Sequence, residues 1–255
     1  MTEATFKFEN RCGLEQLRGT PDLSGIPDNS VRLVLTDPPY LISHIGPTGK
    51  AYEHFDTEDS FTMEDLENFV KEWYRVLVPG GTLIVWFDSF KLGELKAMCE
   101  RAKFGGRYRI IRWIKDSGNQ VEVKQTYIGW GESALVCSKP PAKEIVFNNK
   151  DENGKAIAHR GLFEEKLPRG KDRVHPTQKS VPLFLDLVRL HSNPGDLVLD
   201  SFVGSGATPI ACKITGRQFI GAELNKEYYD LANQRLARIE EEETEGCEKY
   251  VPVFN

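Results

Sequence analysis

The sequence predicts a single α/β domain in which helices cover both faces of a mostly parallel, twisted sheet of the Rossmann type. Three observations favour this fold class. A length of 255 residues suits one large domain, here residues 1–255. Short apolar runs typical of buried strands alternate with segments of helical periodicity. Residues 197–223 read as strand, glycine loop, helix, strand and acidic residue, which is a nucleoside-binding βαβ arrangement.

The individual elements follow in chain order from apolar spacing and turn residues. Residues 1–30 show little periodicity beyond the apolar side of one short helix. Thr62 followed by Asp65 predicts a helix start, and Pro79-Gly80-Gly81 predicts its end and the start of the next strand. Residues 115–131 contain no helical crossover of convincing length, so the strands that flank them are expected to be antiparallel. The expected strands are 31–35, 82–87, 108–114, 133–137, 197–200 and 218–222, and the expected helices are 63–77, 92–102, 181–191, one ending near 215, and 226–242.

Two segments are too long and too irregular for ordinary connections. Residues 41–60 are rich in Gly, Pro, His and acidic side chains, which predicts a mobile active-site loop. Residues 139–174 lose periodicity and are rich in Lys, Arg, Asn, Gly and Pro. We interpret this second segment as a small inserted module or a segment that a partner orders.

The distribution of charge and of cysteines bears on which partners and which covalent or metal sites the protein can have. The net charge is −5, but basic side chains outnumber acidic ones in residues 101–124 and 139–179, while acids gather at 240–248. An acidic protein can therefore still present a cationic face to nucleic acid. The alternative is that these basic residues lie on solvated loops and helix faces and bind no partner. The five cysteines are scattered and form no CxxC pair, which argues against a disulfide framework and a zinc site.

The sequence gives no indication of export or of membrane insertion. The N-terminal residues lack the basic opening and apolar core of a secretory signal, and the longest apolar run, Leu83 to Phe87, is too short to span a bilayer. We therefore expect a cytoplasmic, reducing location, no membrane partner and no metal.

The stretch Thr36-Asp37-Pro38-Pro39-Tyr40 ends an apolar strand with a carboxylate, two prolines and a phenol. Two prolines cannot continue a central strand, so the backbone must leave the sheet here. Open α/β sheets bind ligands beyond the carboxyl ends of their strands, which is where Asp37 and Tyr40 would lie. Taken alone, the stretch is more typical of a simple strand-ending turn, for which Asp and Pro are ordinary residues.

The glycine loop and a second polar cluster are candidate ligand sites. Gly204 and Gly206 permit a sharp turn and close approach of a ligand, and Glu223 could accept hydrogen bonds from ribose hydroxyls. Pro209 stands where the dinucleotide fingerprint has its third glycine, so an adenosine ligand without a pyrophosphate is at least as plausible. Residues 175–180, HPTQKS, precede a helix and would suit a carboxylate, or would serve only as a helix cap.

These motifs in this order resemble the β-class of amino-group DNA methyltransferases. The resemblance rests on TDPPY at 36–40, RVLVPGG at 75–81, HPTQKS at 175–180, LDSFVGSGAT at 199–208, and FIGAE at 219–223 with Tyr228. In that class the DPPY segment precedes the FxGxG segment and the target-recognition region lies between them. The resemblance extends from about Asp28 to Leu236 and identifies residues 139–174 as the inserted target-recognition segment of a methyltransferase domain.

The resemblance implies S-adenosylmethionine as the cofactor, S-adenosylhomocysteine as its product, and no metal. The cofactor residues implied are Phe202, Gly204, Ser205 and Gly206 along the ligand, Asp200 at the strand end, Glu223 on the ribose, and Thr177, Gln178 and Lys179 near the methionine carboxylate.

The resemblance also implies the catalytic residues Asp37, Pro38, Pro39 and Tyr40. Asp37 and the Pro38 carbonyl would accept hydrogen bonds from the exocyclic amine, the prolines would fix their direction, and Tyr40 would stack on the extruded base. Such an amine is a poor nucleophile because its lone pair is delocalised, and acceptors on both N–H bonds favour a pyramidal nitrogen. Methylation at cytosine C5 would instead need a thiolate, and no cysteine follows a proline as it usually does in those enzymes.

The implied function is transfer of a methyl group to the N6 amino group of adenine in double-stranded DNA. The N4 amino group of cytosine is the alternative, although enzymes of that specificity more often carry Ser at the position of Asp37. A non-catalytic nucleic-acid-binding protein of this fold and an oxidoreductase that uses a dinucleotide are rival hypotheses. Asp37, Tyr40 and Gly204 are intact, which counts against the former, and the absent third glycine disfavours the latter.

Two features depart from the family or leave its partners open. Arg11 precedes Cys12 where the family commonly has an acidic residue, so the adenine contact near Asn10–Cys12 stays open. The recognition segment is short, and further DNA contacts would come from residues 101–124 or from a second subunit in a homodimer. A cognate restriction endonuclease in a restriction-modification system is a further expected partner of the class.

Overall fold

The computed structural model describes residues 6–20, 23–39, 61–115, 131–166 and 178–244. The strands of its main sheet are β1 (Phe6–Asn10), β4 (Val31–Thr36), β5 (Leu77–Phe87), β6 (Gly105–Ile114), β7 (Gly131–Ser138), β8 (Leu162–Glu164), β9 (Leu197–Asp200) and β10 (Gln218–Glu223). The helices are α1 (Gly13–Arg18), α2 (Met63–Val76), α3 (Leu92–Arg101), α4 (Val181–His191), α5 (Ala207–Ile214) and α6 (Lys226–Thr244). A short ladder of β2 (Gly19–Thr20) and β3 (Leu23–Ser24) and a 3₁₀ turn η2 (Ala142–Glu144) complete the described elements.

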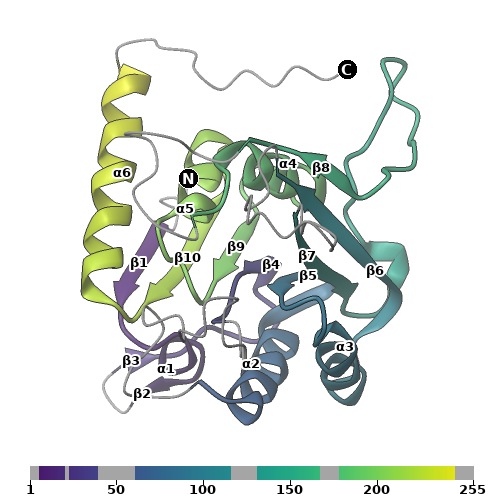
Figure 1. Cartoon of the computed structure of the whole chain (residues 1–255), viewed down its shortest axis with the longest axis horizontal. Coiled ribbons are helices and arrows are strands. Elements are labelled where there is room, and N and C mark those ends of the chain that lie inside the picture. Colours follow the sequence, from purple (N-terminus) through teal and green to yellow (C-terminus); the bar gives the residue numbers. More distant parts are fainter. Residues whose placement is uncertain (1–5, 21–22, 40–60, 116–130, 167–177, 245–255) are drawn as a thin grey trace, which may run out of the picture.

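The eight strands of the sheet follow the order β1-β10-β9-β4-β5-β7-β6-β8 (Figure 1). The first five of these are mutually parallel, β7 runs antiparallel to both β5 and β6, and β8 is parallel to β6. The expected α/β fold and the antiparallel pairing of the strands at 108–114 and 133–137 are therefore confirmed.

This topology brings distant parts of the chain to one edge of the sheet. The carboxyl ends of β1, β10, β9, β4 and β5 lie at the same edge because these strands are parallel. Since β7 is antiparallel, its amino end lies at that edge too, and the register pairs Glu132 of β7 with Trp113 near the carboxyl end of β6. We call this edge, with Asn10, Asp37, Glu132, Asp200 and Glu223 along it, the carboxyl edge.

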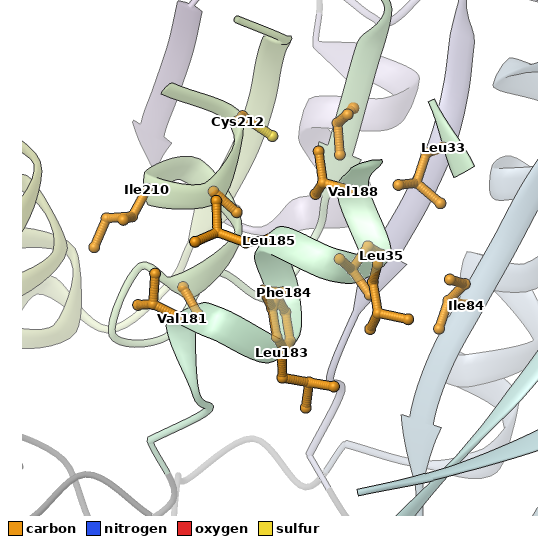
Figure 2. Close-up of a cluster of buried hydrophobic side chains, with 14 of the residues drawn as sticks. Leu33, Leu35, Ile84, Val181, Leu183, Phe184, Leu185, Val188, Ile210 and Cys212 are labelled. Carbon is orange, nitrogen blue, oxygen red and sulfur yellow. The ribbon is translucent and has the colours of Figure 1, made fainter. Parts of the chain in front are cut away.

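Apolar side chains alternate between the two faces of the central strands and form two cores. Leu33 and Leu35 of β4 face a cluster that α4, α5 and α6 cover, whereas Val34 faces a cluster covered by α1, α2 and α3. Figure 2 shows α4 side chains such as Phe184 and Val188 beside Leu35 in the first cluster. Both faces of the sheet are thus buried, as expected for parallel strands that read as continuous apolar runs.

Local sequence explains where α2 begins. Thr62 accepts a hydrogen bond from the Asp65 backbone N–H at 3.1 Å, and the Thr62 backbone N–H donates to the Asp65 carboxylate at 2.8 Å. This reciprocal capping box satisfies two backbone N–H groups that a helix start otherwise leaves without intrahelical acceptors.

The sequence did not predict β1, and it placed the start of β5 too late. Residues 1–30 contain β1, which no local pattern predicted because it forms by parallel pairing with β10, more than 200 residues away in the chain. β5 begins at Leu77 and runs through Pro79-Gly80-Gly81, which were expected to precede the strand. Gly80 has a φ of +74°, and its N–H donates to the Lys139 carbonyl at 2.8 Å, so tertiary pairing extends the strand through the turn-forming residues.

The inserted segment is described over residues 139–166. It contains η2, a bridge between Lys150 and Ala156, and β8, which joins the main sheet beside β6. Its role in target recognition stays a prediction, and the expected loop at 41–60 lies outside the described residues. None of the described helices combines the length and the apolar character needed to cross a bilayer.

Candidate active site

Asp37 directly follows the last residue of β4 at the carboxyl edge. The β4 backbone pairs with β5 up to Thr36, and the chain then leaves the sheet at Asp37-Pro38-Pro39. Pro38 is buried and Pro39 is exposed, while Tyr40 lies outside the described residues. The structure therefore places the carboxylate at the sheet edge where ligands bind in α/β proteins.

Asp37 belongs to a chain of alternating charges. Its Oδ2 lies 2.8 Å from the Lys179 Nζ, and the same ammonium contacts the Glu132 carboxylate. The second oxygen of Glu132 accepts a hydrogen bond from Lys115. We call the chain Lys115–Glu132–Lys179–Asp37 the ion-pair cluster. Lys115 follows β6, Glu132 lies on β7, Lys179 precedes α4 and Asp37 follows β4.

Two indole rings lie beside the lysines of this cluster. The Lys179 Nζ lies 5.8 Å from the centre of the Trp86 ring, and the Lys115 Nζ lies 4.7 Å from the Trp113 ring. The Lys179 side chain is only 8% exposed. Burial of Glu132 would raise its pKa, but the charges and hydrogen bonds of Lys179 and Lys115 outweigh burial and lower the pKa.

Asp200 connects β4 to the glycine loop. One of its oxygens accepts from the Thr36 hydroxyl at 2.8 Å and from the Phe202 N–H at 3.0 Å, and the other accepts from Thr208 at 2.5 Å. Burial raises the pKa of Asp200 to about 7, although these hydrogen bonds act in the opposite direction. The residue was expected at a cofactor site, and the described contacts make it a buried brace between β4 and α5.

The glycine loop leaves space above its backbone at one glycine and none at the other. Gly204 has a φ of +53°, and a Cβ added there would meet no atom within 4 Å. Gly206 has a φ of +90°, and its Cβ would lie 2.9 Å from the Cβ of Ala232 on α6. Gly204 thus leaves room for a ligand, whereas Gly206 lets α5 and α6 pack closely. Ser205 between them is buried.

Glu223 ends β10 beside this loop. Its two oxygens accept hydrogen bonds from the Gly204 N–H at 2.8 Å and the Asn225 N–H at 2.9 Å. Burial raises the pKa of Glu223, and these backbone donors oppose that effect. The Asn10 amide donates to the carbonyls of Glu223 and Leu224, so the end of β1 lies next to the residues that adjoin the glycine loop.

Phe202 packs among aromatic side chains of α2 and the residues before it. Its ring centre lies 4.7 Å from that of Phe69 and 5.5 Å from that of Phe61. Gln178 and Lys179 are both buried immediately before α4, and Thr177 lies outside the described residues. The cofactor and catalytic roles given to these residues stay predictions.

Sequence reasoning missed Glu132, Lys115, Trp86 and Thr36. Glu132 could have been found, because an antiparallel strand that starts after a partner strand ends must start at the same edge. The others depend on side-chain contacts between elements that lie far apart in the chain. Within the described residues no group of three or more His, Cys, Asp or Glu side chains is arranged to hold a metal ion.

Comparison with known proteins places the chain in a family. A family model described as DNA methylase (N6_N4_Mtase) matches residues 31–234. The match covers the ion-pair cluster, Asp200, the glycine loop and Glu223. The protein therefore belongs to the DNA methylase family, which confirms the resemblance to amino-group DNA methyltransferases.

Curated relatives align over most of the chain. The type II methyltransferase M.HpaI of Haemophilus parainfluenzae is 30% identical over an alignment of 234 residues that covers 84% of this chain and 70% of the relative. The DNA adenine methyltransferase YhdJ of Escherichia coli K12 is 31% identical over an alignment of 240 residues that covers 84% of this chain and 79% of the relative.

Solved structures share the fold. The crystal structure of the M1.HpyAVI-SAM complex superposes with a TM-score of 0.70 and 28% identity, covering 91% of this chain and 99% of the other. The cytosine-N4-specific PvuII DNA methyltransferase superposes with a TM-score of 0.66, covering 95% of this chain and 94% of the other. At 18% identity, the PvuII enzyme shows the fold alone.

Proposed function

We propose that this protein transfers a methyl group from S-adenosylmethionine to the N6 amino group of adenine in double-stranded DNA. The observation that carries the proposal is the position of Asp37, a lysine-paired carboxylate at the carboxyl edge, joined through Thr36 and Asp200 to the glycine loop. Family membership supports DNA as the substrate. The adenine assignment draws on YhdJ, a relative named as a DNA adenine methyltransferase.

The glycine loop fits an adenosine-containing cofactor. The space above Gly204 admits a ligand against the backbone, and the Glu223 carboxylate beside it offers acceptors to ribose hydroxyls. The M1.HpyAVI structure, a relative at 28% identity, is a complex with SAM. When bound, S-adenosylmethionine supplies a methyl group on a positively charged sulfur, which is a strong electrophile.

Asp37 acts as an orienting acceptor for the target amine. Its carboxylate accepts a hydrogen bond from one amino N–H, and the Pro38 carbonyl accepts one from the other. With both N–H bonds held, the nitrogen becomes pyramidal and its lone pair is directed at the methyl carbon. With cofactor and DNA bound, the amine lone pair would form the new N–C bond while the electrons of the methyl–sulfur bond would stay on sulfur as S-adenosylhomocysteine leaves, and the nitrogen would then release its extra proton to water. Tyr40 stacks on the extruded base in this proposal, and Thr177 and Gln178 approach the cofactor.

Nucleoside mass spectrometry tests the proposed reaction. Unmethylated double-stranded DNA is incubated with the protein and S-adenosylmethionine, hydrolysed to nucleosides and analysed for methylated products. We expect N6-methyladenine, together with S-adenosylhomocysteine. N4-methylcytosine would overturn the adenine assignment, and no methylated nucleoside with DNA of varied sequence would overturn the reaction.

The variant Asp37→Ala is the catalytic control. Loss of an acceptor that acts on the developing charge should lower the methylation rate by about 10²- to 10³-fold. Binding of S-adenosylmethionine, measured by calorimetry, should persist, because Asp37 is proposed to contact the target amine and not the cofactor. Full methylation by D37A would contradict the proposed mechanism.

DNA binding is expected to be electrostatic in large part. Binding through phosphates should weaken steeply as salt rises, because each contact releases condensed counterions. A homodimer and a cognate restriction endonuclease remain proposed partners, and sedimentation with and without DNA would measure the first of these. Affinity for duplex DNA that stays flat between low and physiological salt would count against DNA as the substrate.

A further inference from the structure

We propose that Glu132 is a positioning residue for methyl transfer, holding the Lys179 ammonium against Asp37. The inference rests on the proposed function, in which Asp37 accepts a hydrogen bond from the target amine. It also deepens that function, since Lys179 then acts on the catalytic carboxylate, in place of the cofactor carboxylate that the family resemblance implied.

The contacts of Lys179 carry the first step. Its Nζ lies 2.8 Å from Asp37 Oδ2 and also contacts Glu132 Oε2, so one ammonium is shared between two carboxylates from different strands. Lysine has a flexible four-carbon stem, and a single partner would leave its direction poorly fixed. A second carboxylate on the same ammonium defines where the charge lies.

The burial of the cluster carries the second step. The side chains of Lys179 and Glu132 are 8% and 18% exposed, so an unmatched charge here would be costly. The cluster contains two ammonium groups and two carboxylates, which balance. Without Glu132, Lys115 and Lys179 would face each other with Asp37 as the remaining carboxylate of the cluster, and their repulsion would displace Lys179 from its present position.

The location of Glu132 carries the third step. It lies on β7, an interior strand hydrogen-bonded to β5 on one side and β6 on the other. The neighbouring Ser133 accepts a hydrogen bond from the Ser89 hydroxyl at 3.1 Å, which ties the turn after β5 to the same strand. A carboxylate on such a rigid element can hold a flexible lysine, and through it the direction of Asp37.

A matched pair of substitutions separates this role from a general loss of an ion pair. Glu132→Gln keeps the shape of the side chain and removes its charge. The control is Glu72→Gln on α2, because Glu72 also contacts two cations, Arg18 at 3.2 Å and Arg75 at 2.7 Å. Its side chain is 16% exposed, close to that of Glu132. Glu72 precedes the amino end of β5 and so lies toward the opposite edge of the sheet.

Single-turnover methylation at saturating S-adenosylmethionine and DNA is the main measurement, with cofactor affinity from calorimetry. We expect E132Q to slow methyl transfer by about 10- to 100-fold, as misplaced reacting groups do, with the cofactor Kd within about threefold of wild type. E72Q should keep the wild-type rate. A wild-type rate in E132Q, or a weakened cofactor Kd with an unchanged saturated rate, would overturn the inference.

A double-substitution cycle tests whether Glu132 acts through Lys179. If it does, adding E132Q to Lys179→Gln should change the rate by less than about threefold, whereas independent effects would multiply. Multiplicative losses would overturn the positioning role, because a purely structural contribution of Glu132 to β7 would persist without Lys179.

Two controls, the folding of the variants and the activity of the wild type, distinguish failure of this inference from misfolding and from failure of the proposed function. If circular dichroism shows that E132Q does not fold, the double variant E132Q/K115Q replaces it, because it removes one charge of each sign. A smaller loss of rate is expected there, because the repulsion from Lys115 is gone but Lys179 still lacks its second carboxylate, and a wild-type rate overturns the inference. An inactive wild-type protein would overturn the proposed function, whereas equal activity of wild type and variant overturns only the role of Glu132.

Discussion

Asp200 should make the stability of this protein fall as pH rises from about 4 to about 7. The carboxylate is 2% exposed, and its two oxygens accept hydrogen bonds from Thr36, Thr208 and the Phe202 N–H. Burial nevertheless dominates and raises its pKa from 3.8 to about 7. The folded protein therefore holds a proton on Asp200 over a pH range in which the unfolded chain has lost it.

The size of the effect follows from that difference. The pKa in the folded state exceeds the unfolded value by about 3 units, and each unit corresponds to 1.36 kcal/mol, so the linked free energy is about 4 kcal/mol. Because the folded pKa is raised, this stabilisation is complete below the unfolded pKa. It declines as pH rises through the interval and is lost above the folded pKa.

Asp200→Asn removes the titration while it keeps the shape of the side chain and hydrogen-bonding capacity toward all three partners. Urea unfolding of wild type and D200N at several pH values between 4 and 8 gives the difference in unfolding free energy. We expect D200N to gain relative to wild type by about 4 kcal/mol across the interval.

Thr208→Val serves as the companion variant. It removes a hydrogen bond that lowers the pKa of Asp200. The decline in stability with rising pH should therefore occur at higher pH in T208V than in wild type. A difference between wild type and D200N that is independent of pH would refute the assignment of a buried, protonated carboxylate between β4 and the glycine loop.

Three further expectations concern the loop, a helix cap and a buried imidazole. Gly204→Ala should cost about 1 kcal/mol because φ is +53°, and it should weaken S-adenosylmethionine binding on the order of tenfold by filling ligand space, as calorimetry would show. Gly206→Ala should cost about 2 to 3 kcal/mol, since it adds contact with Ala232 to a strained φ; equal stability of the two variants would contradict this distinction. Thr62→Ala breaks the capping box and should cost about 1 kcal/mol, lowering the midpoint of thermal unfolding by a few degrees. Burial lowers the pKa of His191 from 6.5 to about 4, so the contribution of His191 to stability, about 3 kcal/mol, is lost as pH falls through that interval and opposes the gain from Asp200. In urea unfolding at pH 4 to 7, His191→Phe should therefore gain about 3 kcal/mol relative to wild type as pH falls.

Much of the fold could be predicted because its determinants are local. The helix at 181–191 and the strand at 197–200 have the predicted bounds, since apolar spacing, proline and turn residues specify them within a few positions. The bounds of β5 were wrong because its first residues pair with Val31 and with the Lys139 backbone, contacts that no local pattern contains. β1 was missed for the same reason, as its pairing with β10 joins the two ends of the chain.

The candidate site divides in the same way. Local sequence patterns were enough to predict the family, the strand-ending carboxylate Asp37 and the glycine loop with Glu223, because each is a short pattern whose chemistry lies in adjacent residues. Tertiary structure alone decided that Asp37 pairs with Lys179, that Glu132 contacts the same ammonium, and that Asp200 braces Thr36. The physical reason is strand direction and register: the parallel strands and the antiparallel β7 bring charges separated by up to about 160 residues to one buried edge, where each must find a partner.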